Sequence, residues 1–215
     1  MPLGSIWPSI NIMDRQALAD ATGDDAARIQ AISAAWDAYF GRLPKPLKVR
    51  PGQSDDNVAV NYCRMIVDKG VSFLFGQDVR FELDETEQTA QEAWLQECWQ
   101  ANRGMVALQK LALSGAMAGH AFAKIVPGRP LPRVVILDPA SVHVHWDPED
   151  LDKVVQYVIQ YSSIDYRTNK VVAFRQRIEQ QDNGRWRIID ELSESGGPWR
   201  LRTDTVWPWT WPPVV

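Results

Sequence analysis

The chain has 215 residues, a formal net charge of −4 and a sequence isoelectric point of about 5.4. Its hydrophobic share of 45% and charged share of 23% are ordinary globular values, which argues against wholesale disorder. The acidic balance argues against a protein held on nucleic acid mainly by neutralising phosphates, although it is compatible with nucleic acid that slides past. The two cysteines, Cys63 and Cys98, favour free thiols in a reducing compartment, and no stretch is apolar enough to span a bilayer.

Apolar residues recur every three or four positions in four segments, and each such segment is predicted to be a helix. The segments are 24–40, 55–75, 84–102 and 105–118. The third begins with the pattern D-x-x-E at 84–87, which is typical of a capping box. A proline-rich connector after the first helix carries Lys45, Lys48 and Arg50. A solvated loop is the favoured interpretation of this connector, and a phosphate contact is the alternative.

The most informative segment runs from Asn61 to Leu83, because its period changes across a single glycine. Before Gly76, one apolar stripe has helical spacing. Its members are Ala59, Tyr62, Cys63, Ile66, Val67, Gly70, Phe73 and Leu74. Gly76 is predicted to take the left-handed position that ends a helix. After it, Val79, Phe81 and Leu83 alternate with charged residues, which predicts a half-buried strand.

From His120 onward the pattern is that of strands bounded by turns. The predicted strands are 120–126, 133–137, 142–146, 154–161, 171–181 and 185–192. Asn183-Gly184 predicts a two-residue hairpin loop between the last two of them. That loop would set Arg177 opposite Asp190 and Ile178 opposite Ile189.

The order of these segments predicts an α+β fold, with N-terminal helices followed by an antiparallel β-sheet of about five or six strands. Three parts are expected. They are an N-terminal helix and connector at 1–54, a helical part at 55–119 and an antiparallel β part at 120–215.

Two groups of polar residues are candidates for metal chemistry. His143 and His145 lie two apart on a predicted strand and project from the same face, so a zinc-dependent hydrolase is one alternative function. The acidic residues Asp147, Glu149, Asp150 and Asp152 lack the glycine and distal glutamate of a calcium loop. They favour a solvated turn, with pairing to a basic patch on a neighbouring chain as a second role.

Four tryptophans lie near the C-terminus: Trp199, Trp207, Trp209 and Trp211. Packing in a core or a subunit interface is the favoured interpretation, and a Trp-rich ligand-binding module is the alternative. No nucleophile with its base and orienting group can be assembled from the sequence. We therefore expect no enzymatic activity and no cofactor.

Three ordered motifs resemble the portal proteins of tailed bacteriophages. The first is the helix with Asn61 and Asp68 that runs into the Val-Ser-Phe-Leu-Phe-Gly element ending at Gly76. The second is Gly119-His120-Ala121-Phe122, and the third is Leu137-Asp138-Pro139 followed by Val142, Trp146 and Asp147. The candidate structural motif residues are Asn61, Asp68, Gly76, Gly119, Asp138, Pro139 and Trp146.

The resemblance implies a structural subunit of a ring, a homo-oligomer of twelve copies in the family's usual form, at one vertex of the virion capsid. It implies contact with the major capsid protein and passage of double-stranded DNA through the channel during packaging and ejection. The terminase large subunit and later a head–tail adaptor would dock on regions outside this chain, with assembly in the host cytoplasm and no membrane. The chain would correspond to the N-terminal wing portion, truncated before the stem and clip that usually follow. No DNA-contacting residue is therefore assigned.

Overall fold

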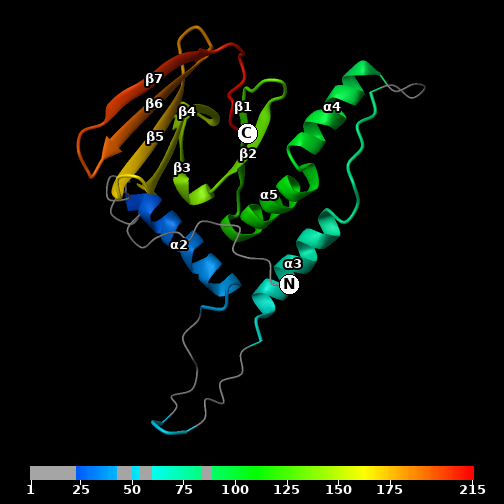
Figure 1. Cartoon of the computed structure of the whole chain (residues 1–215), viewed down its shortest axis with the longest axis vertical. Helices are drawn as coiled ribbons and strands as arrows, with labels where there is room; N and C mark the ends of the chain where they lie inside the picture. Colours follow the sequence, from blue (N-terminus) through cyan, green and yellow to red (C-terminus); the bar gives the residue numbers. More distant parts are fainter. Residues whose placement is uncertain (1–22, 43–49, 54–59, 84–88) are drawn as a thin grey trace. The chain divides into compact units, whose positions relative to one another are not determined.

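The computed structural model of the chain describes residues 23–42, 50–53, 60–83 and 89–215, and it has the predicted α+β fold (Figure 1). Helices come first along the chain and antiparallel strands follow. The described chain forms two compact units, and helix α2 (Gly23–Tyr39) belongs to both. One unit contains residues 141–213 with the start of α2, and the other contains residues 29–140 with the last two residues.

The helical unit contains three further helices and a two-stranded antiparallel ribbon. These are α3 (Tyr62–Leu74), α4 (Ala90–Ala101), α5 (Gly104–Ala118), β1 (Phe122–Val126) and β2 (Arg133–Leu137). The backbone of Val215 forms two hydrogen bonds with Ala123, each 2.9 Å long, so the last residues pair with β1. Ile32, Trp36 and Tyr39 of α2 are buried in this unit.

Helix α4 begins later than the sequence predicts. Its N-cap is Thr89, and the capping box joins Thr89 to Glu92 rather than using the D-x-x-E pattern at 84–87, which lies outside the described residues. The Thr89 amide donates to Glu92 Oε2 at 2.6 Å, and the Leu83 amide donates to Oε1. The buried Glu92 carboxylate therefore satisfies two backbone donors that precede the helix, which is the physical advantage of this cap.

The segment after α3 corrects two predictions. Helix α3 ends at Leu74, its C-cap residue Phe75 has a φ of −126°, and Gly76 is not among the residues with positive φ. Gly76 is required there for close approach instead, because a Cβ would lie 2.8 Å from the Ser72 carbonyl oxygen. Residues 79–83 form no strand, because no described segment pairs with them; Phe81 packs edge-on against Trp99.

The β unit is a five-stranded antiparallel sheet in which strands adjacent in sequence are adjacent in space. Its strands are β3 (Val142–Asp147), β4 (Asp150–Asp165), β5 (Lys170–Gln180), β6 (Trp186–Glu194) and β7 (Arg200–Trp207). Strand β7 was not predicted from the sequence. One face of the sheet carries most of the buried core: Val142, Tyr157, Ile159, Ile178, Trp186 and Trp207.

The β5–β6 hairpin forms, but its predicted register is wrong by one residue. Arg177 lies opposite Ile189, and Ile178 lies opposite Ile188. The loop has three residues, since the amide of Gln181 donates to the carbonyl of Arg185. Within this loop only Gly184 has a positive φ, of 75°, whereas a two-residue type I′ loop would need positive φ at two residues.

Candidate functional site

Two of the motif residues clamp helix α3 onto the end of helix α2. Asn61 Oδ1 accepts a hydrogen bond from the Arg64 amide at 2.9 Å and so caps α3. Asn61 Nδ2 donates to the carbonyls of Ala38 at 3.0 Å and Tyr39 at 2.8 Å, which are among the orphan acceptors at the C-terminal end of α2. One amide side chain therefore satisfies backbone groups of two helices. We call this contact the Asn61 clamp.

The second member of this contact is Asp68, seven residues or about two helical turns further along the same helix face. The Tyr39 hydroxyl donates to Asp68 Oδ1 at 2.6 Å, and Arg64 Nε donates to Oδ2 at 3.3 Å. Burial and the hydrogen bond to Asp68 together raise the pKa of Tyr39 to about 12. The hydroxyl consequently keeps its proton at any physiological pH and acts as a permanent donor to Asp68.

The other motif residues lie at turns and strand positions. Gly119 ends α5 with a φ of 76°, and its amide donates to the Gly115 carbonyl at 2.8 Å. Asp138 Oδ1 accepts from the Ala140 amide at 3.0 Å and so orders the short 3₁₀ turn that begins at the buried Pro139. Trp146 is half-exposed on β3.

Two further features hold the helical unit together and were missed in the sequence. Asn102, just after α4, donates through Nδ2 to the carbonyls of Cys98 and Pro132, and its Oδ1 accepts from the Val134 amide at 2.7 Å. A Cβ at Gly104 would overlap the ring of Trp99, so only glycine fits at the start of α5. An Asn placed shortly before a Gly at the end of a helical pattern was the available signal.

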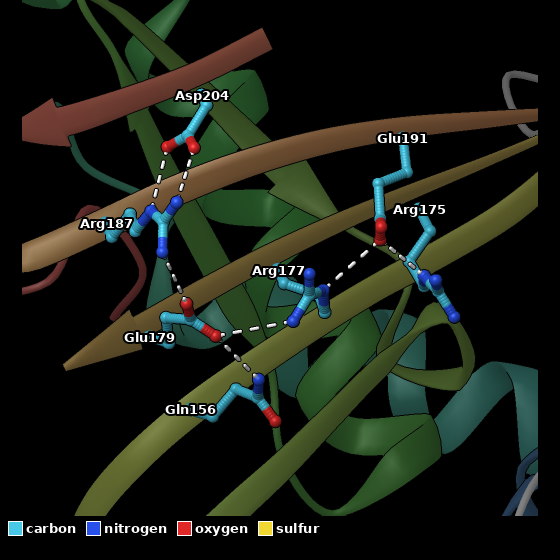
Figure 2. A network of polar contacts seen from close by, with 7 residues as sticks. All are labelled: Gln156, Arg175, Arg177, Glu179, Arg187, Glu191 and Asp204. Carbon is cyan, nitrogen blue, oxygen red and sulfur yellow. Dashed lines mark hydrogen bonds and ion pairs between the residues drawn. The ribbon is translucent and has the colours of Figure 1, made fainter. Parts of the chain in front are cut away.

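A ladder of alternating charges crosses four strands on the face of the sheet opposite Ile178 and Trp186. Figure 2 shows its members: Gln156, Arg175, Arg177, Glu179, Arg187, Glu191 and Asp204. Glu191 Oε2 accepts from Arg175 Nε at 2.8 Å and from Arg177 Nε at 3.2 Å. The three arginines and three carboxylates neutralise one another, so the ladder links strands without leaving a net charge for a ligand.

Electrostatics within the ladder favour its charged form. Burial alone would raise the pKa of Glu191, but hydrogen bonds from Arg175 and Arg177 outweigh it and hold that pKa below the ordinary 4.5. At the far end, the hydrogen bond from Arg187 lowers the pKa of Asp204. Period-two alternation of charge along β5 was a usable signal, but it required the correct register with β6.

The two strand histidines do not form a zinc site with other described residues. His143 Nδ1 contacts Asp25 Oδ2 of α2 at 2.9 Å, and the neighbouring Arg28 donates to the Val142 carbonyl at 3.0 Å. His145 is exposed. Within residues 23–42, 50–53, 60–83 and 89–215, no group of three or more His, Cys, Asp and Glu side chains could hold a metal ion. His143 therefore anchors the start of α2 to β3.

The C-terminal tryptophans divide between core and surface. Trp207 is buried and packs edge-on against Trp209 and Trp211, which stack on each other and are nearly half-exposed. The ring of Trp199 lies 4.2 Å from the Arg175 guanidinium carbon and extends the ladder through a cation–π contact. Trp186 Nε1 donates to the Thr210 carbonyl at 3.0 Å, which fixes this segment on the sheet.

Each polar network described above joins one element of the fold to another. In the part of the chain that the structure describes, no helix is long and apolar enough to cross a membrane. The family model described as "Phage portal protein, SPP1 Gp6-like" matches residues 24–190, from α2 into β6. The chain belongs to this family, which is structural and non-enzymatic. A search of curated proteins finds no match to the chain.

Membership of the portal family has two coarse consequences. It implies that the chain is part of an oligomeric ring associated with a phage capsid. It also implies a location at a capsid vertex of the virion.

Proposed function

We propose that this chain is the wing portion of a portal subunit, the scaffold that surrounds the channel through which phage DNA is packaged and ejected. The observation that carries the proposal is the family match over residues 24–190, because it includes both compact units rather than one common motif. The net charge of −4 argues against a subunit that holds DNA mainly through its phosphates.

The finer parts of the proposal concern assembly. Twelve copies close the ring, which contacts the major capsid protein on the outside and double-stranded DNA in its channel. The terminase large subunit docks on the ring during packaging, and a head–tail adaptor later replaces it. The ring assembles in the host cytoplasm and remains in the virion.

The motif residues support a mechanical role. Asn61 and Asp68 attach α3 to α2, while Gly119, Asp138 and Pro139 order the turns around the β1–β2 ribbon. A portal needs such rigid joints because the scaffold has to keep its shape while DNA is driven through the ring. On this proposal these residues act by positioning elements, and none of them performs chemistry.

The test is the oligomeric state of the protein in the longest form that its reading frame encodes. Native mass spectrometry over a concentration series should give one closed oligomer, with twelve copies as the expected number. A monomer at every concentration would contradict the proposal. Another single copy number would contradict only the count of twelve.

A further inference from the structure

Helix α3 presents an apolar ridge that the described residues 23–42, 50–53, 60–83 and 89–215 leave exposed. None of its thirteen residues is buried, and the exposed fractions are 90% for Phe73 and 68% for Ile66. Tyr62, Ile66 and Phe73 lie at positions i, i+4 and i+11, so they form one straight ridge along the helix. We call these three residues, with Lys69 and Gly70 between them, the α3 ridge.

Two properties of the α3 ridge suit it to receive a protein partner. A Cβ at Gly70 would meet no atom within 4 Å, so another backbone can approach closely at the middle of the ridge. A depression beside the ridge is lined by Met65, Lys69, Gly70 and Phe73, and its other lining residues are Asn61, Arg64, Asp68 and Ser72. The Lys69 ammonium forms no ion pair with any carboxylate of the described residues.

A short amphipathic helix gains most of its stability from packing its apolar face, so the α3 ridge is expected to be covered in the working assembly. The portal family assembles as a ring of identical copies, which makes a second copy the first candidate for the cover. A ring closes through head-to-tail contacts, in which a surface of one copy meets a different surface of the next. The surface that meets the α3 ridge therefore differs from the ridge itself, and this chain offers one candidate for it.

The turn between β3 and β4 has the complementary chemistry. Leu151 is 78% exposed and Trp146 is 51% exposed, and together they give the turn an apolar surface. Glu149, Asp150 and Asp152 form no ion pair within the described residues, whereas Asp147 pairs with Lys153 at 2.9 Å. We call residues 146–152 the β3–β4 tip; it offers apolar side chains for the α3 ridge and carboxylates for Lys69.

We propose that the β3–β4 tip of one copy docks on the α3 ridge of the next copy and forms a repeating subunit contact of the ring. This inference rests on the proposed function, because it assumes a head-to-tail ring. Leu151 and Trp146 cover Ile66 and Phe73, and a carboxylate of the tip pairs with Lys69. Charge complementarity favours this tip over the β4–β5 turn, where the exposed Tyr166 lies beside the cationic Arg167.

Two single variants and their mixture test the contact. Phe73→Asp places a negative charge on the ridge, and Leu151→Asp places a negative charge on the tip, so the two altered surfaces cannot pair with each other in the mixture. Both positions are exposed, so the folded subunit should survive, which circular dichroism checks. Tyr166→Asp is the matched control, since Tyr166 is 85% exposed but lies outside both surfaces.

Each variant alone should need a protein concentration at least about tenfold higher to assemble, because each removes one half of the same contact. An equimolar mixture should form one-to-one dimers and nothing larger, since only one intact tip and one intact ridge remain per pair. The Tyr166→Asp control should assemble like the wild type. Sedimentation velocity measures all four samples.

A cross-linking arm keeps the test decisive if assembly is weak. Cys63 is exposed on α3, so a short bismaleimide should link it to a Leu151→Cys position on the next copy and give a ladder of oligomers. The ladder should disappear when Cys63→Ser is added. Rings that persist in Phe73→Asp would overturn the inference and leave the proposed function intact. A wild type that does not assemble, together with a Leu151→Cys variant that gives no cross-linked ladder, would overturn both. A mixture without dimers would refute the pairing of tip and ridge.

Discussion

Replacing Asn61 by alanine tests the Asn61 clamp, which joins α2 to α3. The alanine variant loses the cap on the Arg64 amide and both hydrogen bonds to the carbonyls of Ala38 and Tyr39. Loss of an N-cap costs about 1 kcal/mol, and each remaining bond contributes about 0.5–1.5 kcal/mol net. Because Asn61 is only half-buried, water can hydrogen-bond to some of the backbone groups that the alanine variant leaves unpaired. We therefore expect the free energy of unfolding to fall by about 1.5–3 kcal/mol in total.

A second substitution separates the two functions of the side chain. Asn61→Ser keeps an oxygen that can cap α3, but its hydroxyl is too short to reach both carbonyls of α2. The serine variant should therefore be about 1 kcal/mol more stable than the alanine variant. The loss of about 1.5–3 kcal/mol expected for Asn61→Ala corresponds to a fall in melting temperature of about 3–12 °C for a protein of this length.

Thermal unfolding followed by circular dichroism measures the global effect, and hydrogen exchange resolved to peptides measures the local one. Amides of α3 should exchange faster in Asn61→Ala, while those of β4 to β6 should keep their wild-type rates. A melting temperature within one degree of wild type for the alanine variant would refute the clamp. Equal stability of the serine and alanine variants would refute only the contribution of the N-cap and would leave the hydrogen bonds to α2 untouched.

Three further substitutions or titrations follow from the structure. Glu191→Gln should cost about 1–2 kcal/mol by removing the shared acceptor of two arginines, and denaturant unfolding should show a much smaller loss for the exposed Glu194→Gln. The pKa of Glu191 is held below 4.5, so the stability that its ion pairs contribute is complete above pH 4.5 and is lost as the pH falls through the lowered pKa. If the stability of Glu191→Gln fell with acid pH as steeply as that of the wild type, this reasoning would be contradicted. Gly104→Ala should destabilise the protein by about 1–3 kcal/mol, because the added Cβ would overlap the Trp99 ring. The control Gly115→Ala should be neutral or stabilise it by up to about 1 kcal/mol. Equal melting temperatures for the two variants would refute the packing argument. The Tyr39 hydroxyl should ionise near pH 12 in an ultraviolet titration. The stability that it contributes is therefore present below pH 10 and is lost between pH 10 and 12. Ionisation at pH 10 would show that the hydrogen bond from Tyr39 to Asp68 is absent.

Periodicity was sufficient for most of the secondary structure. The 3.6-residue spacing predicted α2 and α5 closely, and the period of two predicted β2, β3 and β5 to within a residue at most boundaries. Strand β7 escaped because its residues are exposed along nearly its whole length, so it lacks the alternating burial that marks a strand. Edge strands of this kind are recognised only when the neighbouring strand is known.

Two failures have a more specific cause. The Asn183-Gly184 pair marked a turn correctly, but a pair alone does not distinguish a two-residue loop from a three-residue one, and that difference moved every cross-strand partner by one. The alternation at residues 79–83 was real, yet a strand needs a partner, and Phe81 instead packs against Trp99. Both outcomes were decided by tertiary contacts that local pattern does not contain.

The candidate site was visible from the sequence only in outline. Asn61 and Asp68 were singled out by resemblance, while their partners on α2 lie more than twenty residues away in the chain. The charge ladder depends on the register of four strands, so it could not be built from composition. The α3 ridge was identified as an apolar stripe, but its exposure emerged only from the structure.

The most direct test of the account is electron microscopy of the assembled protein. We predict closed rings in which every copy has the same orientation and an open channel lies at the centre, and we predict that Phe73→Asp abolishes these rings. Closed rings in the wild type would support the portal role, and their loss in the variant would support the tip-and-ridge contact. A population of monomers or of two-fold symmetric dimers in the wild type would contradict the central claim.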